Sequence, residues 1–502
     1  MVKNVLHIVF LLLASLTTQG QEYFSSVHID GDNAETTTNI VLIEGGYATF
    51  GVANVDDTPH INIRKYNLYG EEIEVIQYQL EGNPLTGHAE SFHKVNDGGY
   101  IWVGRASGVR MFRFDTDFDL LWSKEYLDLL PSKWKSFEQA YEYDNGDFLI
   151  LGRTHADGEV TQPEEVLLIK TDNEGNIIWH KVFGDINDND RLIDILPMDD
   201  GGFVFVGAKY FPWDAYIVKI DSEGNKEWHK SYGGDFWDYL ARGVKTQDGN
   251  IVIAFEDSKE HSNLITPNDS YTYTKLHLIK IDPQGNTIWD QEYSWLRIAY
   301  GAKLIEATNG DLIFIGKQNY PSITEVGGST FALRTNSEGD SLWFRHYSHS
   351  GFGEPSSSEA YDIEQTDYGF VMAGVFRPTP LNDNYTQAQH TWIMHIDENG
   401  CVNSSCEFLD IDEDIFIHKN EISLYPNPAD DKIFIQIPEK NLDQNIDVSF
   451  YTITGQLIEE RSLEGLKTTL EINIASLFKG IYIVKITGKN QEALASELLT
   501  IQ

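Results

Sequence analysis

The stretch Lys219–Trp228, KIDSEGNKEW, decides the fold, because close copies of it recur along the chain. The other copies read KTDNEGNIIW at 170–179, KIDPQGNTIW at 280–289 and RTNSEGDSLW at 334–343. Each copy has an apolar strand, an EGN-like turn and a second strand, since glycine accepts a positive φ angle and asparagine tolerates one. Each copy therefore predicts a β-hairpin, and the chain is built from repeated units.

A second phrase, typified by DGGFVFVGA at 200–208, lies between these hairpins and has seven copies. Each copy is a turn that leads into a strand, and each follows another short strand. The unit therefore has four strands. Such a unit, repeated seven times at intervals of 48 to 61 residues, predicts an all-β fold, a seven-bladed β-propeller over residues 21–409. The hairpin turns fall at Gly70, Phe118, Gly175, Gly224, Gly285, Gly339 and Gly400.

A propeller must close its ring, and the segment EYFSSVHID at 22–30 offers a strand for this purpose. It stands before the first inner strand, in the slot that FRHYSHS at 344–350 holds before the seventh unit. We expect it to complete the last blade beside HIDENGCVNSSC at 395–406. The tryptophans of the repeat are predicted to lie in the core between blades rather than to stack on a ligand. They are Trp122, Trp179, Trp228, Trp289 and Trp343.

The composition fits a globular, acidic protein. The 502 residues are 41% hydrophobic and 12% aromatic, which is enough for a sizeable core. The formal net charge is −41, with a pI of about 4.5. Such a surface repels phosphate backbones and anionic lipids, so we expect neither nucleic acid nor a membrane surface as a partner.

The N-terminus has the layout of a secretory signal peptide over residues 1–20: Lys3, then an apolar run from about Val5 to Leu16, then small and polar residues. The alternative is a membrane anchor, for which the run is short. No later segment approaches about 20 apolar residues, so no transmembrane segment is expected in the mature protein.

The two cysteines, Cys401 and Cys406, are five residues apart in CVNSSC. In an exported protein this spacing predicts a disulfide that closes a small loop. The alternative is a metal or redox pair, which the absence of a CxxC motif and of a nearby histidine cluster disfavours.

The composition changes after residue 409, where an acidic linker (410–420) leads into a segment with alternating strands and glycine or asparagine turns (421–502). This pattern predicts a small β-sandwich. The segment resembles the type A C-terminal sorting domain of proteins exported by the type IX secretion system. The residues that carry this resemblance are Tyr425, Pro426, Asn427, Pro428, Gly455, Gly480 and Tyr482.

The resemblance implies that the type IX machinery is a partner, and that the protein reaches the outer cell surface or the medium through the periplasm. The end of the chain, ASELLTIQ at 495–502, lacks the basic residue usual before the last strand of such domains. A generic adhesive β-domain is the alternative. The hairpin repeat itself is similar to exported propeller repeats of bacterial surface proteins, and its spacing departs from those of the sialidase Asp-box, the tryptophan-docking motif and the WD repeat.

No motif predicts a catalytic centre, a metal site or a cofactor. The sequence has no HExxH, GxSxG or Walker loop. DINDND at 185–190 has oxygen ligands at calcium-loop spacing but lacks the glycine and the bidentate glutamate, which favours a solvated acidic turn.

The loops between blades, and those after each GGFVFVG-type strand, are predicted to emerge on one face, opposite the tight turns. Function on a propeller is expected where loops vary. Aromatic and acidic residues of these loops could bind a glycan or a peptide, the aromatics otherwise serving as loop anchors. We therefore predict a binding module, with an extracellular hydrolase or lyase acting on polysaccharide or peptide as the alternative. The candidate ligand-binding residues are Trp134, Trp213, Asp214, Asp235, Trp237 and Asp238.

Overall fold

The computed structural model divides the chain into two compact units, Met1–Val402 and Asn403–Gln502. All regular elements among the described residues are β-strands. No helix there is long and apolar enough to cross a bilayer. The structure describes residues 3–6, 23–28, 35–56, 58–80, 91–106, 108–126, 135–155, 164–183, 190–209, 214–233, 241–261, 271–297, 299–319, 328–348, 357–377, 389–402, 423–425, 429, 431–436, 446–452, 457–463, 469–475, 477, 480–487 and 493–501.

The first unit contains seven antiparallel sheets within these residues, numbered here along the chain. Sheet 1 has β3 (Glu35–Ile43), β4 (Gly46–Val55), β5 (Thr58–Asn67) and β6 (Glu72–Gln79), with β1 (Lys3–Leu6) added outside β6. Sheet 2 has β7 (Phe92–Lys94), β8 (Tyr100–Ala106), β9 (Gly108–Phe114) and β10 (Leu120–Glu125). Sheet 3 has β11 (Lys135–Glu142), β12 (Phe148–His155), β13 (Glu164–Thr171) and β14 (Ile177–Phe183). Sheet 4 has β15 (Asp190–Pro197), β16 (Phe203–Lys209), β17 (Asp214–Ile220) and β18 (Lys226–Tyr232).

The remaining sheets keep the same order. Sheet 5 has β19 (Arg242–Lys245), β20 (Ile251–His261), β21 (Tyr271–Ile281) and β22 (Thr287–Arg297). Sheet 6 has β23 (Ala299–Glu306), β24 (Leu312–Asn319), β25 (Gly328–Thr335) and β26 (Ser341–Tyr347). Sheet 7 has β27 (Ser357–Thr366), β28 (Gly369–Arg377), β29 (His390–Ile396) and, on its outer edge, β2 (Ser25–His28).

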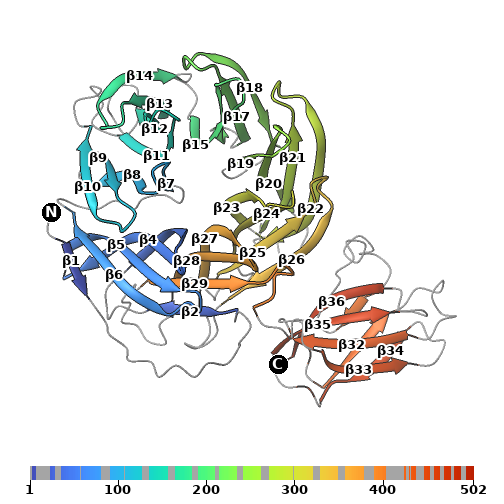
Figure 1. The fold of residues 1–502 in the computed structure, drawn as a ribbon. Coiled ribbons are helices and arrows are strands. Elements are labelled where there is room, and N and C mark those ends of the chain that lie inside the picture. The colour runs from blue at the N-terminus through green and yellow to red at the C-terminus, as the bar shows by residue number, and fades with distance from the viewer. Residues whose placement is uncertain are drawn as a thin grey trace. The chain divides into compact units, whose positions relative to one another are not determined.

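The seven sheets are arranged around one axis, with the first strand of each sheet nearest to it (Figure 1). Each innermost strand packs against the preceding sheet, and β3 of sheet 1 packs against β27 and β28 of sheet 7. The ring is therefore closed, which is the architecture of a β-propeller and confirms the predicted all-β propeller fold. The turns that follow the first and third strands of each sheet lie at one end of the strands, the turn side. The connections that follow the second strand, and those between sheets, lie at the other end, the loop side, and most of them are longer than the turns.

The N-terminal strand closes the ring as predicted. β2 pairs with β29, so that Ser25 lies opposite Met394, and the His395 N–H donates to the Phe24 carbonyl at 2.8 Å. The indole Nε1 of Trp392 donates to Ser25 Oγ at 3.0 Å. Sheet 7 thus joins the two ends of the first unit. β1, which falls in the predicted signal peptide, is an extra edge strand, and sheet 1 has its four repeat strands without it.

The repeated tryptophan links neighbouring sheets. All seven predicted hairpin-turn residues have φ angles between 68° and 84°. A methyl group added at Gly175 would lie 3.1 Å from the Trp122 ring, so the tryptophan of one sheet packs on the turn of the next. The same contact joins Trp179 to Gly224, Trp228 to Gly285, Trp289 to Gly339 and Trp343 to Gly400. The prediction that these tryptophans pack between blades is confirmed.

Two seams, each the interface between neighbouring sheets, fill this contact differently. The strand register places Glu74 of sheet 1 where sheets 2 to 6 have tryptophan. The turn of sheet 2 compensates, because Phe118 replaces the glycine there. Its ring centroid lies 5.4 Å from Lys65 Nζ of sheet 1, and its carbonyl accepts a hydrogen bond from the Tyr78 hydroxyl of sheet 1 at 2.8 Å. At the closing seam, Phe24 takes the tryptophan's place and covers Gly70. An aromatic ring therefore fills each of these positions, from either side of the seam.

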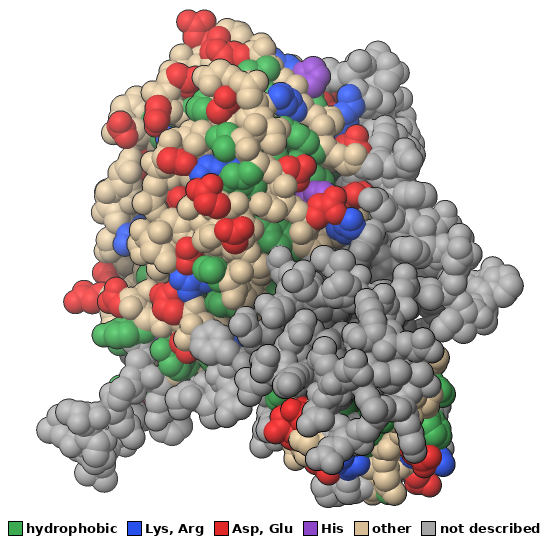
Figure 2. Space-filling model, turned by 90° about the vertical axis from the view of Figure 1, so that its right-hand side faces the viewer, with side chains coloured by type: hydrophobic (Ala, Val, Ile, Leu, Met, Phe, Trp, Pro, Cys, Tyr) green, Lys and Arg blue, Asp and Glu red, His purple; other side chains and the backbone are tan. Residues whose placement is uncertain are grey.

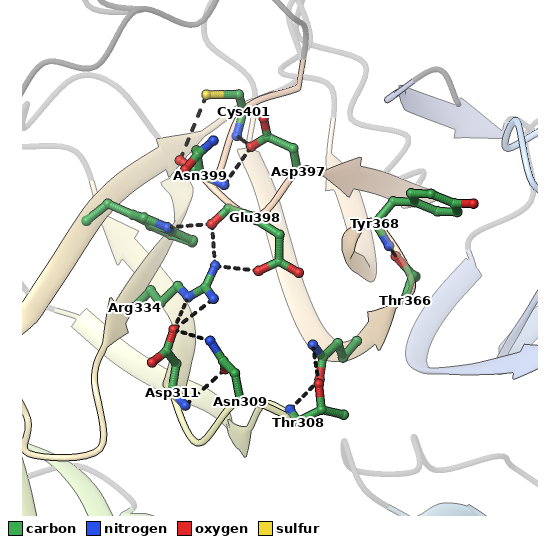
Figure 3. A network of polar contacts seen from close by, with 12 residues as sticks. Thr308, Asn309, Asp311, Arg334, Thr366, Tyr368, Asp397, Glu398, Asn399 and Cys401 are labelled. Carbon is green, nitrogen blue, oxygen red and sulfur yellow. Dashed lines mark hydrogen bonds and ion pairs between the residues drawn. The ribbon is translucent and has the colours of Figure 1, made fainter. Parts of the chain in front are cut away.

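The basic residue of the repeat ties turns together at the turn side. Figure 3 shows Arg334 between Asp311, in the same sheet, and Glu398 of sheet 7. Its guanidinium lies 2.8 Å from the Asp311 carboxylate and 2.6 Å from the Glu398 carboxylate, while Trp343 Nε1 donates to the Glu398 carbonyl at 3.0 Å. Lys219, only 1% exposed, makes the corresponding ion pair with Asp200 at 2.8 Å. These contacts have a structural role.

The second unit is a two-sheet β-sandwich, as predicted. Its hydrophobic core, which includes Ile433, Ile435, Val448, Phe450 and Val484, draws residues from both sheets. One sheet orders β30 (Ser423–Tyr425), β31 (Lys432–Gln436) and β34 (Thr469–Asn473). The other orders β33 (Leu457–Leu463), β32 (Ile446–Thr452), β35 (Gly480–Thr487) and β36 (Ala493–Ile501).

Candidate functional site

Five of the six predicted ligand-binding residues lie outside the described residues. Asp214, the first residue of β17, is the exception. Its Oδ1 atom is buried and has no hydrogen-bond partner among the described residues. Burial raises the pKa of its carboxyl group, an effect that Lys209 opposes. The Oδ1 atom of Asp214 could therefore accept a hydrogen bond from a ligand at the loop side of sheet 4. Trp134, Trp213, Asp235, Trp237 and Asp238, and residues 185–189 of DINDND, lie outside the described part of the chain.

The structure brings together a set of polar residues that the sequence did not predict. Five innermost strands, those of sheets 1, 3, 4, 6 and 7, carry a β-bulge just before the residue that each contributes to this set, as between Leu192 and Asp194 or between Ala360 and Asp362. In sheets 1 and 3 to 7 this residue pairs with the fourth residue of the apolar run of the second strand. In sheet 2 the Ser91 carbonyl accepts a hydrogen bond from the Val103 N–H at 2.9 Å, which places Ser91 at the same level. We call these residues the axial ring: Asn39, Ser91, Gln139, Asp194, Arg242, Lys303 and Asp362.

Side chains of the axial ring tie several neighbouring sheets together. Asp362 Oδ2 accepts a hydrogen bond from the Ile40 N–H at 3.0 Å, and Asp194 Oδ2 accepts one from the Gly243 N–H at 2.8 Å. An innermost strand has no further strand on its axial edge, so a side chain from the preceding sheet satisfies these buried N–H groups. Cations balance the two carboxylates. Arg242 lies 3.2 Å from Asp194, and Lys303 lies 3.7 Å from Asp362.

Glu364 stands two residues after Asp362 on β27 and therefore on the same face of the strand. Its equivalents in sheets 1, 4 and 6 are Val41, Leu196 and Ile305, so the repeat does not require an acid there. Burial and the nearby Asp362 raise the pKa of Glu364 to about 7, with Lys303 opposing the shift. A carboxyl group that titrates near neutral pH can hold or release a proton under working conditions.

A layer of charged residues lies on the loop side of the axial ring. In the seam between sheets 6 and 7, Glu359 is 4% exposed and lies 2.6 Å from Lys317. It also pairs with Arg377 and accepts a hydrogen bond from the Tyr361 hydroxyl at 2.7 Å. Burial alone would raise the pKa of Glu359, but Arg377 and Lys317 outweigh it and lower the pKa to about 2. The carboxylate is ionised across the physiological range.

The seam between sheets 3 and 4 has a second charged group at the same level. Arg153 lies 2.7 Å from Glu138 and 2.6 Å from Glu164. Arg191, on the innermost strand of sheet 4, lies near enough to these residues for their charges to shift its pKa. At these two seams the loop-side end therefore carries ionic groups rather than apolar residues.

Sequence reasoning missed the axial ring and this charged layer because the offset from each repeat motif to these residues varies with the connecting loops. The bulges gave no signal of their own. One usable signal was the arginine or lysine that ends the second strands, as in LGR at 151–153 and IGK at 315–317. Among the described residues no group of three or more His, Cys, Asp or Glu side chains is arranged to hold a metal ion.

The described surface of the sheets is acidic, in keeping with the net charge. Figure 2 shows Asp and Glu side chains spread over one face, with fewer Lys and Arg between them.

Cys401 is buried at the end of sheet 7, and its Sγ lies 3.8 Å from the Asn399 carbonyl oxygen. Cys406 lies outside the described residues, so the disulfide between the two stays a prediction.

The sorting-motif residues fall partly within the described residues of the second unit. Tyr425 ends β30, is 43% exposed and stacks on Phe434 with the ring centroids 5.7 Å apart. Tyr482 on β35 is 8% exposed and belongs to the core. Gly480 begins β35. Pro426, Asn427, Pro428 and Gly455 lie outside the described residues.

Comparison with known proteins bears on the two units differently. Residues 423–499 match the family model of the secretion system C-terminal sorting domain. No curated protein matches the chain. Several solved structures are similar at low identity. A protein of unknown function from Bacteroides caccae is 11% identical with a TM-score of 0.36, and the match covers 60% of this chain and 91% of that one.

Puromycin hydrolase is 10% identical with a TM-score of 0.44, and the match covers 82% of this chain and 59% of the hydrolase. A Bombyx mori family 32 β-fructofuranosidase is 12% identical with a TM-score of 0.29, covering 73% and 86% of the two chains. At these scores the likenesses say nothing about activity. The sorting-domain match does establish where the protein goes: the chain is an exported protein, an all-β propeller unit followed by a type IX secretion system C-terminal sorting domain that delivers it to the cell surface or the medium.

Proposed function

We propose that the propeller is an extracellular binding module that takes a saccharide or a peptide at the loop side of its ring. The observation that carries this proposal is the charged layer of Glu138, Arg153, Arg191, Lys317 and Glu359 on the axial strands and their neighbours. Charged groups are seldom buried without a reason, because each loses its hydration. Here they cluster at the end of the ring that bears the long connections.

Asp214 supports the same location. Its buried Oδ1 has no hydrogen-bond partner in the described part of the chain, and it follows Trp213 directly in the sequence. A carboxylate accepts hydrogen bonds from sugar hydroxyls or peptide N–H groups, and an aromatic ring stacks on the apolar face of a sugar. The mature protein is presented outside the cell, where such ligands occur.

The test is binding of the purified propeller, residues 21–409, to a glycan array and a peptide array. The comparison is the Trp213→Ala, Trp237→Ala double variant, with thermal unfolding measured for both proteins. We expect a defined set of ligands for the parent protein and loss of that binding in the variant, with little change in melting temperature. Absence of any ligand for the parent protein would refute the proposal. A variant that binds as well as the parent would instead show that these tryptophans anchor loops, and an unfolded variant is replaced by Asp214→Asn.

A hydrolase or lyase is the second candidate, and Glu364 is the observation that favours it. A proton donor needs a pKa near the working pH, and the pKa of Glu364 is about 7. The neighbouring Asp362 is less available for chemistry, because both of its oxygens accept backbone N–H groups, from Ile40 and from Ile363. The test is release of reducing ends or peptide fragments from whichever ligand the arrays identify. Turnover that disappears in Glu364→Gln while binding persists would establish an enzyme.

A further inference from the structure

The strand registers allow the seam between sheets 3 and 4 to be compared position by position with the seam between sheets 6 and 7. Arg153 and Lys317 occupy equivalent positions, because each pairs with the residue that lies two positions before the bulged residue of its innermost strand. Arg191 and Glu359 are equivalent on the innermost strands of the following sheets, where they pair with Ala208 and Val375. Each seam therefore brings a residue at the Arg153/Lys317 position next to a residue at the Arg191/Glu359 position.

The two seams carry different charges at these positions. In one, Lys317 and Glu359 make an ion pair at 2.6 Å. In the other, two arginines take their places. Arg153 is engaged by Glu138 and Glu164, at 2.7 and 2.6 Å. Arg191 makes no hydrogen bond or ion pair among the described residues, and its Nε atom is buried without an acceptor. The fold itself therefore does not demand a cation at position 191, since an acid serves in the equivalent place.

The surroundings of Arg191 destabilise its charged guanidinium group. Burial lowers the pKa of Arg191; Glu138 and Glu164 oppose that effect, while Arg153 and Arg242 reinforce it. The carboxylates of Glu138 and Glu164 balance charge near it, and both form ion pairs with Arg153. A guanidinium group has five donors in a planar fork, and leaving buried donors unpaired destabilises the folded state.

We propose that Arg191 binds an anionic group, a carboxylate or a sulfate, of the ligand that enters the loop side of the ring. A guanidinium holds either oxyanion through two parallel N–H bonds, which satisfies its donors and fixes the ligand's orientation. The ligand carries single, spaced charges rather than a dense polyanionic chain, because the net charge of −41 repels a polyanion. This inference rests on the proposed binding function and narrows it to acidic ligands.

The experiment uses the full mature chain and three probes: D-glucuronate, glucose 6-sulfate and neutral glucose, each in millimolar thermal-shift titrations at constant ionic strength. The variants are Arg191→Gln, Arg191→Lys and Arg345→Gln. Arg345 is a matched control, because its Nε is also buried without an acceptor among the described residues but lies at the turn side, against Gly400. The parent protein and Arg345→Gln should be stabilised by an acidic sugar and not by glucose.

Arg191→Gln should weaken binding of that acidic sugar roughly 10- to 100-fold, the usual effect of removing a charged hydrogen bond. Arg191→Lys should keep part of the affinity, because it retains the charge but not the fork. Comparing the two acidic probes tells whether carboxylate or sulfate is preferred.

The inference is wrong if neither acidic sugar stabilises the parent protein more than glucose does, or if Arg191→Gln responds like the parent. Array binding to neutral glycans that Arg191→Gln leaves intact would keep the proposed function and overturn this inference. No ligand on either array, together with no stabilisation by any of the three probes, would overturn both. Circular dichroism of each variant checks that its fold is intact, and Arg191→Lys substitutes for Arg191→Gln if the latter is unfolded.

Discussion

Glu364 should make the stability of the propeller depend on pH in a defined direction, and Glu364→Gln should remove that dependence. The pKa of Glu364 is raised from 4.5 to about 7, first by burial and then by Asp362, against the opposing effect of Lys303. In the unfolded chain the carboxyl group releases its proton near the lower value. Between the two values the folded state holds a proton that the unfolded state has lost, so unfolding is favoured as pH rises.

The direction of the pH dependence follows from the protonation states of Glu364 in the folded and unfolded chain. Below about pH 4.5 the Glu364 carboxyl group does not make the free energy of unfolding depend on pH, because it is protonated in both the folded and the unfolded state. As pH rises through the folded-state pKa of about 7, the folded protein must ionise a carboxyl group in a buried place, and stability is lost. The difference between 4.5 and about 7 corresponds to about 3 kcal/mol, an upper limit because Glu364 is only partly buried.

The assay is chemical denaturation of the parent protein and of Glu364→Gln at pH 4.5, 6 and 8. Glutamine has nearly the same shape and does not ionise. At pH 4.5 the two proteins should have similar free energies of unfolding, and at pH 8 the variant should be more stable by up to about 3 kcal/mol. Other titrating groups affect both proteins alike, so the difference isolates Glu364. Equal stabilities at all three pH values, or a variant that is less stable at pH 8, would refute the reasoning.

Three further predictions concern ring closure, turn geometry and export. Removing residues 22–30 should lower stability by several kcal/mol, because β29 loses its partner strand and Gly70 loses the Phe24 ring, and an unchanged melting temperature would mean that the ring closes in another way. Gly70→Ala should cost roughly 1–3 kcal/mol more in thermal unfolding than Gly310→Ala, because both glycines have positive φ but only Gly70 lacks room for a methyl group; equal costs would contradict the packing of Phe24 on this turn. Deleting residues 421–502 should leave the propeller folded but retained in the periplasm, as followed by cell fractionation; arrival of the truncated protein at the surface would refute the role of this domain in sorting.

The architecture could be predicted from the sequence because it depends on local geometry that repeats. A turn that needs a positive φ angle favours glycine wherever it occurs, so the seven turn positions were visible, and even Phe118 was placed at the correct turn by its neighbours. The segment 22–30 was assigned to the last sheet because it filled a slot that the repeat left empty, and β2 lies there. The sorting domain was visible because its motifs keep their order over a short stretch.

The tertiary structure alone decided which charged residues meet. Asp194 and Arg242 are 48 residues apart and Asp362 and Ile40 are 322 apart, yet each pair is within hydrogen-bonding distance. The connecting loops vary in length, so no fixed spacing links one innermost strand to the next, and a one-residue bulge changes which face a side chain takes. Arg191 could not be recognised as different from Glu359 until the strand registers aligned them. A turn's conformation depends on a few adjacent residues, whereas the charges around the axis depend on how seven sheets close into one ring.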